Sequence, residues 1–365
     1  MPRYTPLVAS LPSTVPFVGP ETQERARGSE FKARLGANEC VFGPSPLAIK
    51  AMADAAAEVW MYGDPENHDL KAALAAHHGV APENIVVGEG IDGLLGYLAR
   101  MFVEPGVTVA TSLGAYPTFN FHVAGYGGRL VTAPYVGDHE DPDNLLALAV
   151  KENASLIYIS NPDNPMGTWH DAATMQAMSD AAPENAVLIL DEAYCEFAPE
   201  GTCPPLDVSR PNVIRMRTFS KAYGMAGARV AYAIAETELA TAFNKVRNHF
   251  GVNRIAQAGA LAALADQDYL NSVVSQVAAG RNQIGKIAET NGLATIPSAT
   301  NFVAIDCGRD GAYAKSVLDA LIAHNIFVRM PFVEPQNRCI RVSAGRSKDL
   351  VPVEQGVKDS LETTV

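Results

Sequence analysis

One stretch of the chain combines a lysine with several groups that bind phosphate. Residues 218–229 read Thr-Phe-Ser-Lys-Ala-Tyr-Gly-Met-Ala-Gly-Ala-Arg and lie between two apolar, strand-like runs. Lys221 is flanked by small residues, which leave space for a ligand close to the backbone. Thr218 and Ser220 offer hydroxyl donors and Arg229 a guanidinium fork, a set that suits a phosphate. A lysine nucleophile beside a phosphate site suggests a Schiff base with pyridoxal phosphate (PLP), although this stretch alone also fits a surface lysine in a loop.

Two more polar motifs come directly after apolar runs. Residues 161–168 read Asn-Pro-Asp-Asn-Pro-Met-Gly-Thr, and the two Asn-Pro pairs bend the chain and fix the Asn164 amide at a strand end. Asp191 follows the run 187–190, and its burial would be expensive without a cationic partner such as a protonated pyridine nitrogen. Taken singly, these motifs also fit a simple turn and an acid at a helix start.

A glycine-rich turn offers a further anion site. Residues 88–93 read Gly-Glu-Gly-Ile-Asp-Gly, between a short strand at 85–87 and a helix expected from about 91 to 102. The free backbone N–H groups of such a helix start and the helix dipole both favour an anion. The spacing differs from the dinucleotide fingerprint, and the acid expected about twenty residues later is missing, which disfavours a nicotinamide dehydrogenase. An ordinary strand-to-helix turn is the alternative.

The elements that must position these motifs alternate between strand and helix. Helices separate most of the predicted strands, which lie near 107–111, 129–133, 156–160, 187–190, 213–217 and 229–234. This pattern predicts an α/β fold with a mostly parallel sheet, in which ligands bind beyond the carboxyl ends of the strands. Beyond residue 240 it changes to helical stretches at 236–249, 253–266 and 268–292 and to strands at 301–305 and 339–342 around a helix near 311–323.

The chain therefore divides into three predicted parts. Residues 1–44, rich in proline, glycine and charge, predict an extended arm; 45–240 predict a large domain and 241–365 a smaller α+β domain. The 365 residues are 48% hydrophobic and 19% charged, a globular composition. A net charge of −12 argues against nucleic acid as a partner, and no apolar run is long enough for a membrane span. The five scattered cysteines and the absence of a signal-like start predict a metal-free cytoplasmic protein with reduced thiols.

Together, the motifs NPDNPMG, DEAYCEF and TFSKAYGMAGARVAY resemble those of the fold-type-I PLP-dependent aminotransferases of class I/II. The resemblance runs from about Asn38 to Arg341 and is nearest to the histidinol-phosphate aminotransferase branch. It implies a large PLP-binding domain with a mixed, mostly parallel sheet flanked by helices, plus a smaller α+β C-terminal domain. It also implies a homodimer with shared active sites.

The resemblance assigns roles to residues around the cofactor. Lys221 would hold PLP as an internal aldimine and move the proton between the substrate Cα and the cofactor C4′, which requires a lowered lysine pKa. Asp191 would pair with the pyridine N–H⁺, and Asn164 and Tyr194 would hydrogen-bond the ring O3′. Tyr116 matches the aromatic residue that stacks on the ring face.

Other residues would bind the phosphate and the substrate. The phosphate ligands implied are Thr218, Ser220, Arg229 and the backbone N–H groups of Ile91 and Asp92, together with Tyr62 reaching the cofactor of the neighbouring subunit. In the small domain Arg341 would bind a substrate carboxylate, and Arg329 would add charge for a phosphate-bearing substrate or remain a solvated strand-end arginine. Asn38 would line the substrate pocket.

The expected function is amino-group transfer between histidinol phosphate, or a related amino acid, and 2-oxoglutarate, a step of histidine biosynthesis. The alternatives are a PLP-dependent decarboxylase or lyase of the threonine-phosphate decarboxylase type, an aromatic amino acid aminotransferase, and a PLP-binding regulator or inactive scaffold. The chain departs from the family pattern at Met166, where threonine is usual, at the turn 90–93 and in the arm motif 36–40. These departures concern specificity more than cofactor binding.

Overall fold

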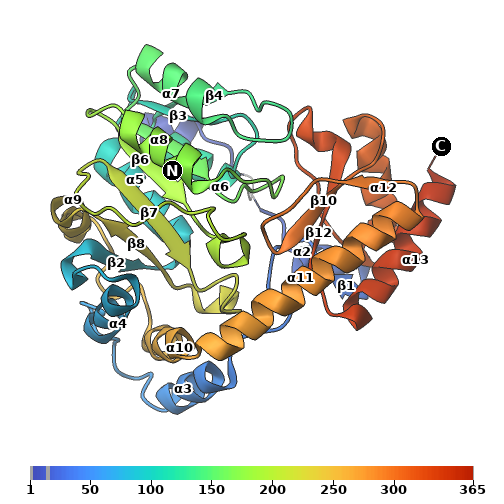
Figure 1. Ribbon diagram of the computed structural model, residues 1–365, viewed down its shortest axis with the longest axis horizontal. Coiled ribbons are helices and arrows are strands. Elements are labelled where there is room, and N and C mark those ends of the chain that lie inside the picture. Colours follow the sequence, from blue (N-terminus) through green and yellow to red (C-terminus); the bar gives the residue numbers. More distant parts are fainter. Residues whose placement is uncertain (1–2, 14–16, 365) are drawn as a thin grey trace.

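The computed structural model describes residues 3–13 and 17–364, so residues 1–2 and 14–16 of the predicted arm lie outside the described residues. The described chain forms a larger lobe around a seven-stranded sheet and a smaller lobe beside it (Figure 1). The strand order is β2-β8-β7-β6-β5-β3-β4. The strands are β2 (Ile85–Gly88), β3 (Thr108–Ser112), β4 (Arg129–Ala133), β5 (Leu156–Ser160), β6 (Val187–Asp191), β7 (Val213–Thr218) and β8 (Ala231–Ala235). β8 is antiparallel to both neighbours and the other pairs are parallel, which gives the mixed, mostly parallel sheet that the sequence predicts.

The sheet is covered on both faces because its central strands are apolar on both sides. In β5, Leu156 and Tyr158 face one core cluster, while Ile157 and Ile159 face another, as the two-residue period of a strand requires. The first face is covered by α5 (Gly90–Phe102), α6 (Pro117–Gly125) and α9 (Thr237–Ala242). The second is covered by α7 (Pro142–Lys151) and α8 (Ala172–Ala181).

A third group of helices packs at the β2 end of the sheet. It consists of α3 (Pro46–Ala56), α4 (His68–His78) and α10 (Arg254–Ala265). Two helices are shorter than predicted. The Ser45-Pro46 pair and the alanine-rich residues after it predict a helix to about residue 60, but α3 ends at Ala56, where i→i−3 turns replace the α-helical bonds. The helix expected over 236–249 ends at Ala242, followed by a 3₁₀ turn at Phe243–Lys245, because the sequence from 246 to 253 contains weak helix formers, including Asn248 and Gly251.

The smaller lobe is an α+β unit. Its antiparallel sheet has the order β12-β10-β9, with β9 (Ala294–Thr295), β10 (Phe302–Asp306) and β12 (Cys339–Ser343). It is covered by α12 (Gly311–Ala323), α13 (Ser347–Thr363) and the second half of α11 (Gln267–Thr290). α11 joins the lobes, because Leu270 and Val273 belong to the core of the larger lobe whereas Ile284 and Ile287 belong to that of the smaller one (Figure 1).

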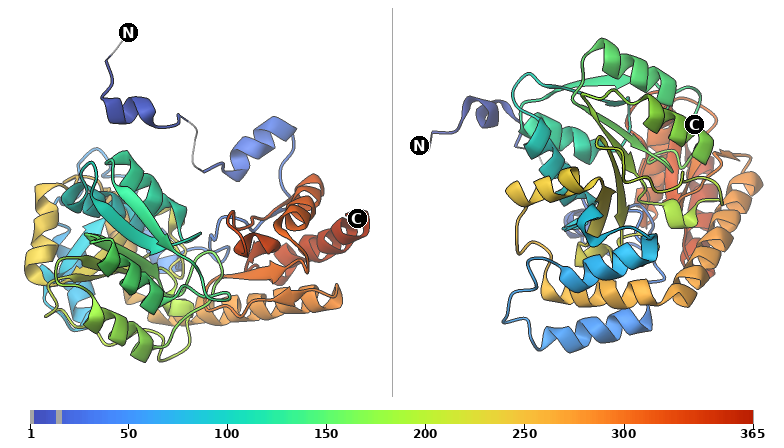
Figure 2. Two further views of the ribbon diagram at one scale, coloured as in Figure 1. Left: turned by 90° about the horizontal axis from the view of Figure 1, so that it is seen from above. Right: turned by 60° about the vertical axis from the view of Figure 1, so that its left-hand side comes forward.

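The N-terminal segment differs from the extended arm that was predicted. It contains α1 (Pro6–Ser10) and α2 (Pro20–Arg27), each with proline in its first turn, and Figure 2 shows α2 beside the smaller lobe. β1 (Ala33–Arg34) pairs in parallel with β11 (Ile326–Phe327), which buries Leu35 in the core of the smaller lobe. This packing was not predicted from the sequence, because a strand of two residues is too short to show an alternating apolar pattern.

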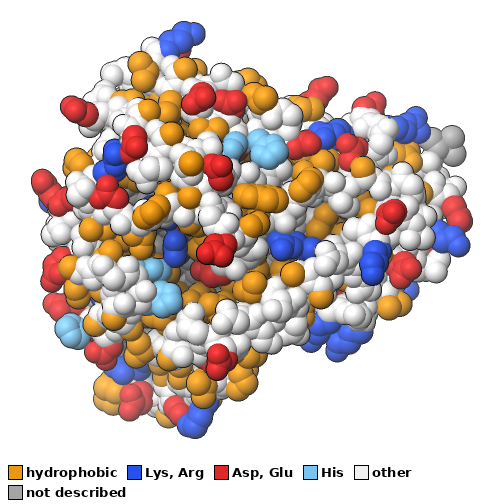
Figure 3. Space-filling model, in the orientation of Figure 1, with side chains coloured by type: hydrophobic (Ala, Val, Ile, Leu, Met, Phe, Trp, Pro, Cys, Tyr) orange, Lys and Arg blue, Asp and Glu red, His pale blue; other side chains and the backbone are white. Residues whose placement is uncertain are grey.

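The predicted division at residue 240 stays a prediction. α9 spans it, and α10, which follows it, packs closely on α3 of the larger lobe. Figure 3 shows acidic and basic side chains interspersed on one face of the molecule, with no band of one sign. Within residues 3–13 and 17–364, no helix is both long enough and apolar enough to cross a membrane.

Candidate active site

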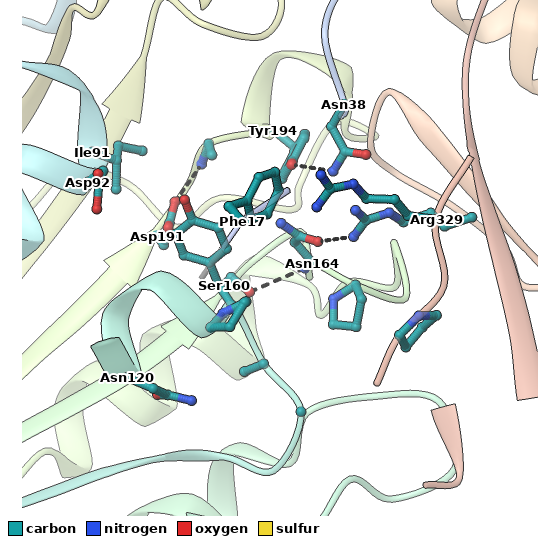
Figure 4. A pocket seen from close by; sticks show the side chains of 18 of the residues that line it. Phe17, Asn38, Ile91, Asp92, Asn120, Ser160, Asn164, Asp191, Tyr194 and Arg329 are labelled. Carbon is teal, nitrogen blue, oxygen red and sulfur yellow. Dashed lines mark hydrogen bonds between the residues drawn. The ribbon is translucent and has the colours of Figure 1, made fainter. Parts of the chain in front are cut away.

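A cavity of about 500 Å³ opens between the lobes, at the carboxyl ends of the central strands. Its lining includes every predicted site residue except Tyr62: Asn38, Ile91, Asp92, Tyr116, Asn164, Asp191, Tyr194, Thr218, Ser220, Lys221, Arg229, Arg329 and Arg341. Figure 4 shows Ile91 and Asp92 at one end of this space and Arg329 at the other, with Asp191, Asn164 and Tyr194 between them. The topology therefore brings together motifs that are far apart in the sequence.

Lys221 lies in the tight turn that follows β7. Gly224 closes this turn with a positive φ of 69° and lies close to the carbonyl of Gly43, so a side chain there would be strained. The Lys221 Nζ donates a hydrogen bond of 3.1 Å to the backbone carbonyl of Asn38. Burial, followed by the charges of Arg341 and Arg229, lowers the pKa of Lys221 to about 8. About a tenth of an amine with this pKa is neutral at pH 7, far more than at the ordinary lysine value.

Asp191 ends β6 and is only 4% exposed. Its Oδ2 accepts a hydrogen bond of 2.7 Å from the Tyr158 hydroxyl, and its Oδ1 accepts one of 3.0 Å from the Ala193 N–H. Burial raises its pKa to about 6 against the effect of these donors. Tyr158 is not among the site residues predicted from the sequence, although a tyrosine inside an apolar strand signals that its hydroxyl needs a buried partner.

The opposite end of the cavity is built to receive an anion. α5 begins at Gly90, which leaves the N–H groups of its first turn free at the edge of the cavity. Arg229 has a left-handed backbone with a φ of 55°, and its Nη1 donates 3.4 Å to the Ser220 Oγ. Ser220 N in turn donates 3.0 Å to the Thr218 Oγ1. A β-carbon at Gly90, whose φ is 81°, would collide with the Arg229 guanidinium, so glycine is required for this close approach.

Asn164 and Tyr194 are held from the substrate side of the cavity. The Asn164 Oδ1 accepts a hydrogen bond of 2.5 Å from the Arg341 Nη1, and the Tyr194 hydroxyl accepts one of 3.0 Å from the Asn38 Nδ2. Burial raises the pKa of Tyr194, so its hydroxyl keeps its proton. Tyr116 lies just before α6, where burial also raises its pKa.

Two arginines lie side by side at the mouth of the cavity. Arg329 and Arg341 pair through reciprocal backbone hydrogen bonds of 3.2 and 2.6 Å. The Arg329 guanidinium lies 3.7 Å from the ring centroid of Phe17 and donates to the Val18 carbonyl. Burial, then the Arg341 charge, lowers the pKa of Arg329 to about 10, and the Arg341 Nε is buried without a partner. Adjacent cations with neutral partners form a site suited to an anion with several oxygens.

Tyr62 does not lie with the other predicted residues. It is 76% exposed, its ring packs 4.5 Å from the ring of Phe250, and it does not line the cavity of its own chain. Neighbouring Trp60 is 81% exposed and Val59 is also exposed. This apolar surface, Val59, Trp60, Tyr62 and Phe250, is set apart from the cavity.

A pair of buried carboxyl groups behind Asn164 was also missed. Glu140 Oε1 accepts hydrogen bonds of 3.1 and 2.9 Å from the backbone N and the Oγ of Ser160, and Asp163 Oδ1 accepts one of 3.0 Å from the Tyr135 hydroxyl. Burial and the neighbouring Asp163 charge raise the pKa of Glu140 well above its usual range, and burial raises that of Asp163 to about 6. Glu140 Oε2 is buried and unpaired. In sequence, Glu140 sits in a polar loop and resembles a solvated acid.

Glu192, the second acid of the Asp-Glu motif, has a structural role. Glu192 accepts hydrogen bonds of 2.9 Å from the Nε of Arg215 and of 2.9 Å from the Nε of Arg217. Burial alone would raise the pKa of Glu192, but Arg217 and Arg215 outweigh it and hold the pKa below its usual value. This buried ion pair ties β6 to β7 beneath the cavity.

The donor set fits pyridoxal phosphate. The helix start at Gly90, the hydroxyls of Thr218 and Ser220 and the Arg229 guanidinium all line one end of the cavity, and the absence of a β-carbon at Gly90 lets the guanidinium approach the helix start. A buried carboxyl group suits a pyridinium nitrogen and a partly neutral lysine suits an aldehyde. Among residues 3–13 and 17–364, no cluster of three His, Cys, Asp or Glu side chains could hold a metal ion.

Comparisons with known proteins agree on one family. The family described as aminotransferase class I and II matches residues 32–353. A histidinol-phosphate aminotransferase of Anaeromyxobacter sp. (strain Fw109-5) is 38% identical over 335 residues, which cover 90% of this chain and 91% of that protein. Histidinol-phosphate aminotransferase 2 of Carboxydothermus hydrogenoformans is 35% identical over 337 residues, covering 91% of each. The crystal structure of histidinol-phosphate aminotransferase from Sinorhizobium meliloti in complex with pyridoxal-5′-phosphate matches with a TM-score of 0.97 and 53% identity, covering 100% of this chain and 99% of that one.

Proposed function

Because the chain belongs to the class I and II aminotransferase family, we propose that it moves an amino group between histidinol phosphate, or a closely related amino donor, and 2-oxoglutarate. The predicted fold type and the prediction of a PLP-dependent aminotransferase are confirmed by this membership and by the similarity to a PLP complex. The names of the relatives support histidinol phosphate as the donor.

The cofactor would lie along the cavity between the start of α5 and the two arginines. Its phosphate would receive the N–H groups of Ile91 and Asp92 and the side chains of Thr218, Ser220 and Arg229. When bound, PLP withdraws electrons from the substrate Cα. The Asp191 carboxylate would accept the pyridine N–H, held in place by the Tyr158 hydroxyl. Tyr194 and Asn164 would hydrogen-bond the ring O3′, and Tyr116 would stack on the ring.

Lys221 would be the base that takes the proton from the substrate Cα and returns it to the cofactor carbon. Its pKa of about 8 supports this role, since an amine with an ordinary lysine pKa would be almost fully protonated at pH 7. A buried Tyr194 hydroxyl that keeps its proton can donate a hydrogen bond near this lysine.

Arg341 and Arg329 would bind the anionic end of each substrate. The unpaired Arg341 Nε and the nearby charges of two arginines on paired backbone segments support binding of a dianion such as a phosphate monoester. A carboxylate of 2-oxoglutarate would use the same fork. Asn38, which lines the cavity beside Tyr194, would border this substrate space.

We further propose a cytoplasmic homodimer in which Tyr62 reaches the cofactor phosphate of the partner chain. The exposed apolar surface that includes Trp60 and Tyr62 supports an interface, since such a cluster is unfavourable in contact with water. The distance of Tyr62 from the cavity of its own chain agrees with a role in a second one.

The observation that carries the proposed function is a lysine and a buried carboxyl group facing one cavity that ends in two arginines. The test compares histidinol phosphate, histidinol and L-phenylalanine as donors with 2-oxoglutarate, with glutamate formation as the readout. We expect kcat/KM for histidinol to be about 100-fold lower than for histidinol phosphate, because it leaves the buried arginines without an anion. Equal values for the two donors would contradict the proposed substrate, and a preference for phenylalanine would favour the aromatic aminotransferase.

A matched pair of variants tests the assignment of the lysine. Lys221→Ala should lose the visible absorbance of bound PLP and the activity. Lys71→Ala should keep both, although burial lowers the pKa of Lys71 as well, because Lys71 lies outside the cavity. Retention of the lysine-linked absorbance in Lys221→Ala would refute the role of Lys221.

A further inference from the structure

One backbone carbonyl in the cavity receives two side-chain donors. The Asn38 carbonyl accepts a hydrogen bond of 3.1 Å from the Lys221 Nζ and one of 3.0 Å from the Asn301 Nδ2. Asn301 and Asn38 are 1% and 3% exposed. A carbonyl oxygen has two lone pairs, so both can be satisfied at once. The position of this oxygen, and with it that of the Lys221 amine, therefore depends on Asn301.

Asn301 is itself rigidly placed in the smaller lobe. It directly precedes β10, and its carbonyl accepts a hydrogen bond of 2.8 Å from the Ala344 N–H. The N–H of Asn38 is held from the same lobe, since it donates 3.1 Å to the Ser343 Oγ, and Asn38 has a left-handed φ of 55°. Two side chains of the smaller lobe thus fix the strained Asn38 backbone over the lysine of the larger lobe.

The unpaired atoms argue against a merely structural asparagine. The Oδ1 atoms of both Asn301 and Asn38 are buried without a hydrogen-bond partner. An unpaired buried acceptor destabilises a fold, and an apolar side chain of the same size would avoid that cost. The satisfied part of the Asn301 side chain is its N–H donor, which binds the Asn38 carbonyl that holds Lys221 and, more weakly at 3.4 Å, the Glu39 carbonyl.

We propose that Asn301 is a positioning residue, which acts through the Asn38 carbonyl to hold the Lys221 amine where it exchanges a proton with the substrate. The proposal rests on the proposed role of Lys221. It also links the two lobes chemically, because Asn38 donates to the Tyr194 hydroxyl as well. Movement of the smaller lobe away from the larger one would withdraw one acceptor from the amine and one donor from the phenol.

The proton affinity of the lysine is the property that such a contact changes. Burial and the positive charges of Arg341 and Arg229 favour the neutral amine, whereas Glu39 and Asp191 favour the ammonium. A carbonyl acceptor at 3.1 Å also favours the ammonium. A negative charge placed at residue 301 would also favour the ammonium form of Lys221, since it would lie beside the same carbonyl.

The first test is Asn301→Asp, which keeps the shape of the side chain and replaces the N–H donor with a charged oxygen. We measure the rate at which the full-length chain, freed of cofactor, captures added PLP across a range of pH. Capture needs the neutral amine, so its midpoint reports the proton affinity of Lys221. We expect the midpoint to rise by about one pH unit, which slows capture about tenfold at pH 7.

Asn84→Asp is the matched control. Asn84 is also buried and donates 2.9 Å to a backbone carbonyl, that of Ala235, but it lies at the far end of the sheet. This variant should lose stability without moving the capture midpoint. An Asn301→Asp midpoint equal to that of the wild type, or an equal shift in Asn84→Asp, would overturn the proposal.

Two more variants keep the test decisive if Asn301→Asp does not fold. Asn301→Leu and Ser343→Ala each release the Asn38 peptide from one side. For both we expect kcat to fall about tenfold while the KM for 2-oxoglutarate stays unchanged, because the loss of either bond displaces the Asn38 carbonyl and with it the lysine, but not the arginines. An unchanged kcat in both would overturn the inference. If only Lys221→Ala fails to capture PLP, the inference about Asn301 fails while the proposed function stands. The failure of the inference is therefore distinguishable from the failure of the proposed function.

Discussion

Lys221 and Asp191 are ionisable groups whose pKa values are shifted toward each other by the same cavity. Burial lowers the first from 10.5 to about 8 and raises the second from 3.8 to about 6. Each shift reflects the cost of removing a charge from water, and a bound pyridinium would reverse only the shift of Asp191. Burial thus makes Lys221 available as a base, and it leaves the neighbouring Asp191 suited to a cationic ligand.

The two arginines at the mouth of the cavity predict a selective loss of substrate binding. Arg341→Ala should raise the KM for 2-oxoglutarate about 30- to 100-fold, since it removes a partly buried charge that faces an anion. The loss of kcat should be smaller because the proton transfer at Lys221 is left in place. Steady-state kinetics with varied 2-oxoglutarate measure both.

Arg338→Ala is the control for this change. Arg338 lies close by in the chain but pairs with Asp138 and Asp306 at 2.7 Å, and it does not line the cavity. Its removal should affect stability more than KM. An unchanged KM in Arg341→Ala, or the same rise in Arg338→Ala, would remove Arg341 from the substrate site.

The buried carboxyl pair predicts how stability depends on pH. The folded-state pKa values of Glu140 and Asp163 are raised, so the folded chain binds protons that the unfolded chain releases. Their contribution is fully present below the unfolded pKa values of about 4, and stability is lost as the pH rises through the folded values. Glu140→Gln removes one charge and supplies an N–H next to Asp163. It should therefore be more stable than the wild type at pH 8 by about 1–3 kcal/mol, with little difference at pH 4.5.

Thermal unfolding at the two pH values measures this effect. Glu152→Gln is a control, because Glu152 is partly exposed, pairs with Arg129 at 2.8 Å and has a lowered pKa, so its loss should not stabilise the chain at pH 8. A Glu140→Gln variant that is less stable than the wild type at pH 8 would mean that the Glu140 charge is needed.

At the scale of the element, the start of α5 depends on a glycine. Gly90→Ala should weaken PLP binding about tenfold or more, because the β-carbon would push the Arg229 guanidinium away and the φ of 81° is strained for alanine. Gly106→Ala is matched to it, since Gly106 also has a positive φ, of 94°, but its β-carbon would meet open space. Equilibrium titration with PLP should show weakened binding in the first variant alone. Equal affinities would remove this helix start from the phosphate site.

Elements with long apolar runs were predictable from the sequence. β5 matches the predicted 156–160 because all five residues are buried, and α12 matches 311–323 because its apolar residues recur at helical spacing. α13 was not predicted, since Pro352 and Gly356 interrupt a helix whose buried face is set by Leu350, Val353 and Val357. Its stability comes from packing on the smaller lobe, which local propensity does not reveal.

The cavity lining was predictable to the extent that it follows strand ends. Lys221, Asp191 and Asn164 each come directly after an apolar run, so the topology of a parallel sheet brings them together. Tyr158, which donates to Asp191, and Asn301, which donates to the Asn38 carbonyl, were not predictable, because a buried hydrogen bond depends on register and lobe packing between distant segments. The sequence thus identifies the groups that meet the ligand more readily than those that hold them.

At the scale of the whole molecule, shared active sites predict complementation between two defective chains. If the partner's Tyr62 completes each cavity, Lys221→Ala and Tyr62→Ala should both be impaired. A mixed dimer of the two has one site with both residues intact, since the site with a native Lys221 then receives Tyr62 from the Lys221→Ala chain. Random mixing makes half of the dimers mixed, so about a quarter of wild-type activity should return.

Co-expression of the two variants with different affinity tags isolates the mixed dimer, and light scattering reports its mass. The Tyr62 side chain is 76% exposed in the single chain and its ring packs on that of Phe250, so its replacement should leave the fold intact. Activity in the isolated mixed dimer no higher than in Tyr62→Ala alone would place Tyr62 outside the partner's site. A purely monomeric wild type would refute both the interface and the sharing. Restored activity would mean that each active site is built by two chains. The exposed surface around Trp60 would then be the interface through which each chain supplies Tyr62 to the cavity of the other.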